Sequence, residues 1–145
     1  MYKNIKFKHS ITLKKFLNKK LKKDQNIFRY NFHDNKNDKD QLMMIWQKKN
    51  YFYPPKKFLD SQKIYFLNKG KLNVYIFDKN GKLLKVHKLS KENPVCKIKK
   101  NVYHADVAKS SYAIHSEVTA HSFNKRKIVL LSIKNLSKIK RILIS

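Results

Sequence analysis

The sequence predicts an all-β domain, built as a sandwich or barrel of short strands. Apolar residues recur over many short runs, some alternating with polar ones, and turn-forming residues separate the runs. The clearest turn contains Asn80-Gly81 between two apolar runs, a pair that is typical of a β-hairpin. Strand and helix patterns do not alternate, which argues against folds built on a parallel sheet.

The expected strands follow one another closely along the chain. They lie at residues 28–32, 42–46, 51–55, 63–67, 72–77, 82–87, 95–98, 112–118 and 128–133. Successive side chains of a strand point to opposite faces, so residues spaced by two share a face. On this basis the side chains expected in the core are those of Ile64, Phe66, Leu72, Val74, Ile76 and Ile114.

Basic segments flank the expected barrel, which spans residues 27–133. Residues 1–26 form a basic N-terminal segment, and residues 11–23 within it carry apolar side chains at helical spacing. We expect a short amphipathic helix there, capped by Ser10 and packed on the core. The basic tail at 134–145 mixes charged and apolar residues, which predicts either a short helix or a last strand.

The charge of the chain is strongly positive. Its 145 residues include 35 Lys and Arg against 9 Asp and Glu, for a formal net charge of +26. One explanation is a surface for nucleic acid or another polyanion, and the other is codon bias, because Lys, Asn and Ile share AT-rich codons. Specific phosphate and base contacts favour arginine, and only three arginines are present: Arg29, Arg126 and Arg141. Any binding of nucleic acid is therefore expected to be non-specific.

The sequence also carries signals about the compartment. Cys96 is the only cysteine, so an intrachain disulfide is excluded and a reducing environment suits the chain. The N-terminus lacks the apolar stretch of a secretory signal, and no run is long enough for a membrane helix. We therefore expect a cytoplasmic protein without a membrane span.

Several segments between residues 27 and 124 share their order and spacing with a known family. They are RYNFH at 29–33, Gln41, YPP at 53–55, IYFL at 64–67 with Gly70, VYIFD at 74–78 with Asn80-Gly81, VYH at 102–104, and Glu117. In this order they resemble the WbuC-type cupins. The resemblance implies a double-stranded β-helix, which is a jelly-roll barrel with a pocket at one mouth. It also implies a role in surface-polysaccharide or sugar-nucleotide metabolism.

The same resemblance implies a divalent metal, which cupins bind through two His and one Glu of a first motif and one His of a second. In this chain Pro55, Lys57 and Lys63 fall on the first three positions, and only His104 matches the fourth. A cation needs several imidazoles or carboxylates that converge on it, and ammonium groups would repel it. We therefore expect neither a bound metal nor another cofactor.

The lost metal position suggests a site for an anion. Lys57, Lys63 and His104 are the candidates to bind a phosphate, a carboxylate or a sugar nucleotide in the pocket, unless the lysines bend outward to water. Arg29 and His33 lie on one face of a strand. That face either lines a polar pocket for the same ligand or faces solvent.

Three functions remain open at this point. The first is a metal-free binding protein for an anionic or sugar ligand. The second is an isomerase or epimerase-type enzyme with His104 and Glu117 as general acid and base, although Glu117 could instead form an ion pair with a lysine or Arg29. The third is a non-specific nucleic-acid-binding protein. Because cupins often form dimers, a homodimer is one expected assembly, but no residue identifies an interface.

Overall fold

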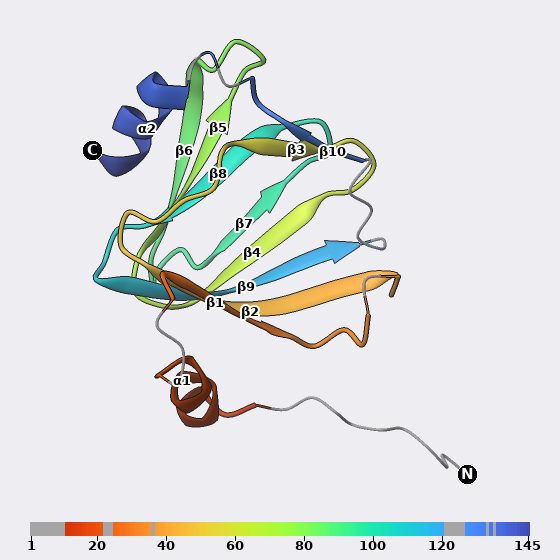
Figure 1. Cartoon of the computed structure of the whole chain (residues 1–145), viewed down its shortest axis with the longest axis vertical. Coiled ribbons are helices and arrows are strands. Elements are labelled where there is room, and N and C mark those ends of the chain that lie inside the picture. Colours follow the sequence, from red (N-terminus) through yellow and green to blue (C-terminus); the bar gives the residue numbers. More distant parts are fainter. Residues whose placement is uncertain (1–10, 22–24, 36, 121–126, 133, 135) are drawn as a thin grey trace.

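The computed structural model describes residues 11–21, 25–35, 37–120, 127–132, 134 and 136–145. Two five-stranded antiparallel sheets face each other (Figure 1). The first sheet contains, in spatial order, β1 (Ile27–Asn31), β2 (Asp40–Lys48), β9 (Tyr112–Ala120), β4 (Lys63–Lys69) and β7 (Val95–Ile98). The second contains β10 (Ile128–Leu130), β3 (Lys56–Phe58), β8 (Tyr103–Ala108), β5 (Leu72–Phe77) and β6 (Leu83–Leu89). This jelly roll confirms the predicted all-β fold class.

The apolar core fills part of the space between the sheets. Tyr65, Leu72 and Val74 are fully buried there, with Cys96 and Ile98 packed against them. The same inner faces also bury a set of polar side chains, which are Gln41, Gln47, Lys63, His104, His115 and Glu117. The interior is therefore divided between an apolar cluster and a polar region.

The predicted core side chains are confirmed on β5 but wrong on β4, and the one on β9 is buried on the outer face of its sheet. Leu72 and Val74 are fully buried between the sheets, and Ile76 is partly buried against them. Ile114 is also fully buried, but it packs with Phe16 and Phe28 under α1. Strand β4 has the opposite orientation, because Phe66 is 40 % exposed and Lys63 only 4 %. Lys63 and Tyr65 take the inner face of β4 in place of Ile64 and Phe66.

The predicted N-terminal helix is present as α1 (Leu13–Leu21). Phe16 is fully buried against Phe28 and Ile114 on the outer face of the first sheet, and the two phenyl centroids are 5.4 Å apart. Thr12 caps the helix, because its Oγ1 accepts a hydrogen bond of 3.2 Å from the backbone N–H of Lys15. The expected cap, Ser10, lies outside the described residues.

The C-terminal tail forms a helix rather than a strand. Helix α2 (Leu136–Ile144) buries Ile139 and Leu143 against Tyr75 and Val107 of the second sheet. Figure 1 shows α2 beside β5 and β6, on the side away from the first sheet. Each sheet is thus covered on its outer face by one short helix. In the described part of the chain, no helix has the length and apolar character needed to cross a membrane.

Two strands differ from the prediction. Residues 51–55 form no strand, and β3 instead begins directly after Pro55, because Pro54 and Pro55 have no N–H to donate to a sheet. Strand β8 was not predicted from its pattern, since His104 and Asp106 interrupt its apolar residues. Both strands contribute to the polar region between the sheets.

We expect Phe16→Ala to lower the free energy of unfolding by about 3 kcal/mol, because it removes a large buried side chain and leaves a cavity under α1. Urea unfolding followed by tryptophan fluorescence measures this change, since Trp46 packs against the same cluster.

Leu13→Ala is the matched control, because Leu13 lies on the same helix and is 43 % exposed. Its effect should be small. Equal effects of the two substitutions would contradict the docking of α1 through Phe16.

Candidate ligand-binding cavity

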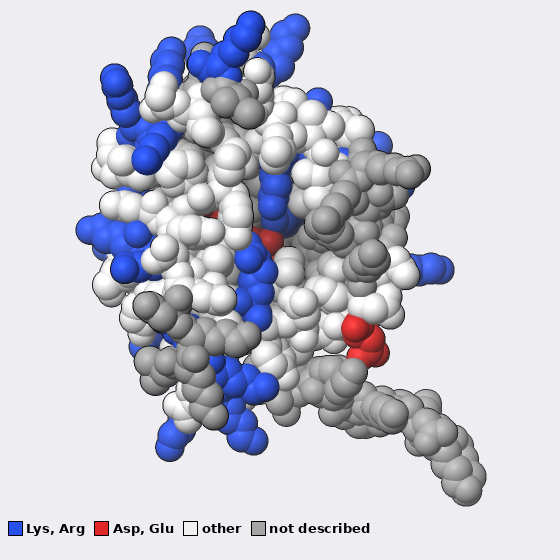
Figure 2. All heavy atoms as spheres, viewed as in Figure 1, with Lys and Arg blue, Asp and Glu red and all other residues white. Residues whose placement is uncertain are grey.

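A cavity of about 440 Å³ lies between the two sheets. Its walls come from β1, β2, β4 and β9 on one side and from β3 and β8 on the other. In Figure 2, basic side chains flank acidic atoms in the hollow near the middle of the face. The charged residues that line the cavity are Arg29, Lys56, Lys63, Lys127, Asp60, Asp106 and Glu117.

An ion pair lies in the cavity wall formed by β4 and β9. Lys63 Nζ lies 2.7 Å from Glu117 Oε2, and both side chains are almost fully buried. Burial alone would raise the pKa of Glu117, but attraction to Lys63 lowers it to about 2. Glu117 is therefore a permanent carboxylate near neutral pH. It forms the ion pair that the sequence left open as the alternative to a catalytic role.

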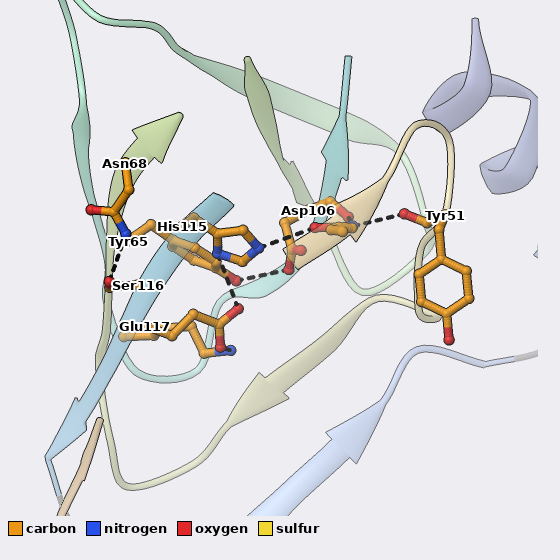
Figure 3. A network of polar contacts seen from close by, with 9 residues as sticks. Tyr51, Tyr65, Asn68, Asp106, His115, Ser116 and Glu117 are labelled. Carbon is orange, nitrogen blue, oxygen red and sulfur yellow. Dashed lines mark hydrogen bonds and ion pairs between the residues drawn. The ribbon is translucent and has the colours of Figure 1, made fainter. Parts of the chain in front are cut away.

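A hydrogen-bond network extends from this pair through His115 (Figure 3). Gln47 Nε2 donates to the backbone oxygens of Tyr51 at 2.7 Å and Asp106 at 3.0 Å. These bonds direct Gln47 Oε1 toward His115 Nε2, which is 3.1 Å away and must donate. His115 Nδ1 therefore carries the lone pair. It has no hydrogen-bond partner among the described residues and lies 3.8 Å from Glu117 Oε1.

His104 has a similar arrangement on β8. Its Nδ1 lies 2.9 Å from the backbone oxygen of Val102 and donates to it. Nε2 is therefore left as an acceptor, and the described part of the chain offers it no partner. Burial first, and the charge of Lys63 second, lower the pKa of His104 to about 4. At neutral pH the cavity thus contains an uncharged imidazole with one free acceptor.

Three other groups of the network could approach a metal ion. The ligand atoms of Asp106, His115 and Glu117 lie within 4.8 Å of one another. However, Lys63 takes one oxygen of Glu117, and the Tyr65 hydroxyl donates to Asp106 Oδ1 at 3.1 Å. The three residues therefore do not fit a divalent cation, because the Lys63 ammonium already neutralises the Glu117 carboxylate at hydrogen-bond distance.

Two cations near Tyr53 lack a carboxylate partner among the described residues. The Arg29 guanidinium lies 5.1 Å from the centroid of the Tyr53 ring, and Lys56 Nζ lies 5.8 Å from it. Arg29 also donates to the Tyr53 hydroxyl at 3.3 Å. Among the described residues, no carboxylate forms an ion pair with Arg29 or Lys56. Lys127 differs, since it pairs with Asp60 at 2.8 Å.

The structure brings four of the five predicted ligand-binding residues to this cavity. Arg29, His33, Lys63 and His104 line it. Lys57 does not, because its ammonium lies 4.9 Å over the Tyr103 ring, outside the cavity. Its neighbour Lys56 lines the cavity instead, since adjacent residues of a strand point to opposite faces.

Sequence reasoning missed Lys56, Gln47 and Asp106. The direction of the Lys56 side chain could be predicted only once the start of β3 was known, because Pro54 and Lys56 then lie on the same side of the segment. Asp106 was not found because strand β8 was not predicted. No pattern in the sequence indicated that Gln47 would orient His115.

We expect stability to fall as the pH drops from 6.5 toward 4. The unfolded chain gains a proton at His104 near its ordinary pKa of 6.5, whereas the folded protein resists protonation until about pH 4. This difference is worth up to about 3 kcal/mol. In urea unfolding at several pH values, His104→Gln should reduce the slope of stability against pH. An unchanged slope in His104→Gln would contradict the neutral, buried imidazole.

Comparison with known proteins supports the fold. No protein-family model matches the chain, and no curated protein matches it. Solved structures do match. The capsular polysaccharide assembling protein CapF from Staphylococcus aureus has a TM-score of 0.65 at 12 % identity, over 76 % of this chain and 33 % of that chain. This chain therefore spans about a third of the CapF chain.

Two further structures show the same likeness. Protein SO0799 from Shewanella oneidensis has a TM-score of 0.61 at 12 % identity, over 81 % of each chain. Oxalate decarboxylase from Bacillus subtilis has a TM-score of 0.57 at 11 % identity, over 72 % of this chain and 27 % of that chain. The opposed antiparallel sheets and these neighbours together show that the chain has the jelly-roll fold of the cupins.

Proposed function

We propose that the cavity binds a small anion that also carries hydroxyl groups, such as a sugar with a phosphate or a carboxylate. The observation that carries this proposal is the pair Arg29 and Lys56, two cations without a described carboxylate partner in one cavity. Charges in a partly dry site attract each other more strongly than charges in open water. An anion placed between Arg29 and Lys56 would neutralise both.

The rest of the wall suits the hydroxyl groups of such a ligand. His104 Nε2 is a free acceptor, so it can accept a hydrogen bond from a hydroxyl but offers no proton at neutral pH. Asp106 adds a second acceptor in the same wall. The volume of about 440 Å³ falls within the range of about 300–1,000 Å³ that is common for ligand pockets.

A role in surface-polysaccharide or sugar-nucleotide metabolism is part of this proposal. CapF is described as a capsular polysaccharide assembling protein, and the resemblance of the sequence to WbuC-type cupins leads to the same area of metabolism. We propose a binding protein without a metal, because Lys63 already supplies the positive charge beside Glu117.

We expect Lys56→Met to weaken the binding of a sugar phosphate by about tenfold or more, because a charge-assisted contact contributes roughly 1.5–3 kcal/mol. Titration calorimetry with glucose 1-phosphate and glucuronate, at low and physiological salt, measures the affinity. Arg29→Met should have an effect of similar size.

Lys57→Met is the matched control, since it removes the same charge from the adjacent residue outside the cavity. If Lys56→Met and Lys57→Met weaken binding equally, the effect is that of net charge, and the proposed site is wrong. The proposed site is also wrong if the wild-type protein binds neither glucose 1-phosphate nor glucuronate.

A further inference from the structure

Lys56 differs from the other lysines of the cavity. Lys63 and Lys127 are each held by a carboxylate, at 2.7 Å and 2.8 Å. Lys56 has no described carboxylate partner, and its Nζ lies 5.8 Å from the ring centroid of Tyr53 and 5.9 Å from that of Phe58. An aromatic face attracts an ammonium less strongly than a carboxylate at hydrogen-bond distance does, so Lys56 lacks the close counter-charge that Lys63 and Lys127 have.

We propose that Lys56 is a nucleophile that forms an imine with a small, carbonyl-bearing anion bound in this cavity. This inference rests on the proposed function, because the anion site brings the carbonyl to the amine. It also narrows the ligand class to 2-keto acids and to sugar phosphates or sugar acids in their open-chain form.

The chemistry requires no other reagent. The Lys56 amine adds to the carbonyl carbon, a C–N bond forms, and the carbonyl oxygen leaves as water. In balance, one ammonium and one carbonyl give one protonated imine and one water. Lys56 releases its proton to solvent before it attacks, and a proton from solvent is taken up when the carbonyl oxygen leaves as water. Arg29 is placed to pair with the anionic group of the ligand.

The electrostatic surroundings of Lys56 support this role. Repulsion from Lys63, followed by burial, lowers the pKa of Lys56, whereas Glu117 and Asp106 act in the opposite direction without cancelling the effect. Arg29 repels the charged form as well. A lysine that is partly desolvated and next to another cation is more often the free amine, which is the nucleophilic form.

The neighbouring lysines provide an internal comparison. Lys63 belongs to the same wall, but its ammonium donates to Glu117 at 2.7 Å and is engaged in that ion pair. Lys57 is next in sequence and lies outside the cavity over Tyr103. A reaction that depends on the cavity must therefore select Lys56 over both, although all three have the same side chain.

The test uses the full chain with pyruvate as the probe, in the presence of cyanoborohydride, which reduces an imine to a stable carboxyethyl-lysine. Peptide mass spectrometry with fragmentation then locates the modified residue. We expect several-fold more modification at Lys56 than at Lys57 or Lys63. Acetone, which lacks the carboxylate, should show no such preference. Lactate, which lacks the carbonyl, should slow the reaction at Lys56 alone.

Further variants separate this inference from the proposed function. Arg29→Met should remove the preference for Lys56 with pyruvate, because the carboxylate loses its partner. Equal modification of Lys56 and exposed lysines in the wild-type protein would overturn the inference. If sugar phosphates bind in a Lys56-dependent way while pyruvate gives no preference, the anion site stands and the imine does not. If neither occurs, both proposals fail.

Discussion

The ion pair between Lys63 and Glu117 is the constraint on which the polar interior depends. A buried carboxylate or ammonium is costly unless it has a close partner of opposite charge. Lys63 and Glu117 are such partners for each other at 2.7 Å. Their pairing fixes the face that β4 turns inward. Tyr65 shares that face and donates to Asp106 on β8, so the pair lies on adjacent strands of the first sheet and the network reaches across to the second. Ile64 and Phe66 take the other face as a consequence.

The same pair sets the electrostatics of the cavity around it. Lys63 keeps Glu117 ionised, but its charge also acts on His104 and Lys56, whose charged forms it disfavours. Burial first, and this buried ammonium second, lower the pKa of His104, and the same ammonium lowers the pKa of Lys56. A metal ion could impose similar effects in principle, but here the cation is part of the chain and cannot be removed by a chelator.

The fold could be predicted from the sequence because short apolar runs and turns are local signals. The all-β class, the N-terminal helix and the hairpin at Asn80-Gly81 all depend on neighbouring residues. The orientation of β4 could not be predicted in this way, since both Ile64/Phe66 and Lys63/Tyr65 have the spacing of an inner face. Only the partners on β8 and β9, distant in sequence, decide between them. Lys56 was missed for a similar reason, as its direction depends on where β3 begins.

The outward position of Phe66 has a consequence for the behaviour of the protein in solution. Phe66 lies opposite Val95 in the pairing of β4 with β7, and these side chains are 40 % and 46 % exposed. Adjacent exposed apolar groups promote contacts between molecules. The net charge of +26 opposes such contacts through mutual repulsion, which added salt screens to a range of about 10 Å at 0.1 M. Colloidal stability should therefore fall as ionic strength rises. The charge of the lysines keeps the molecules apart, although the exposed apolar surface of the sheet favours self-association.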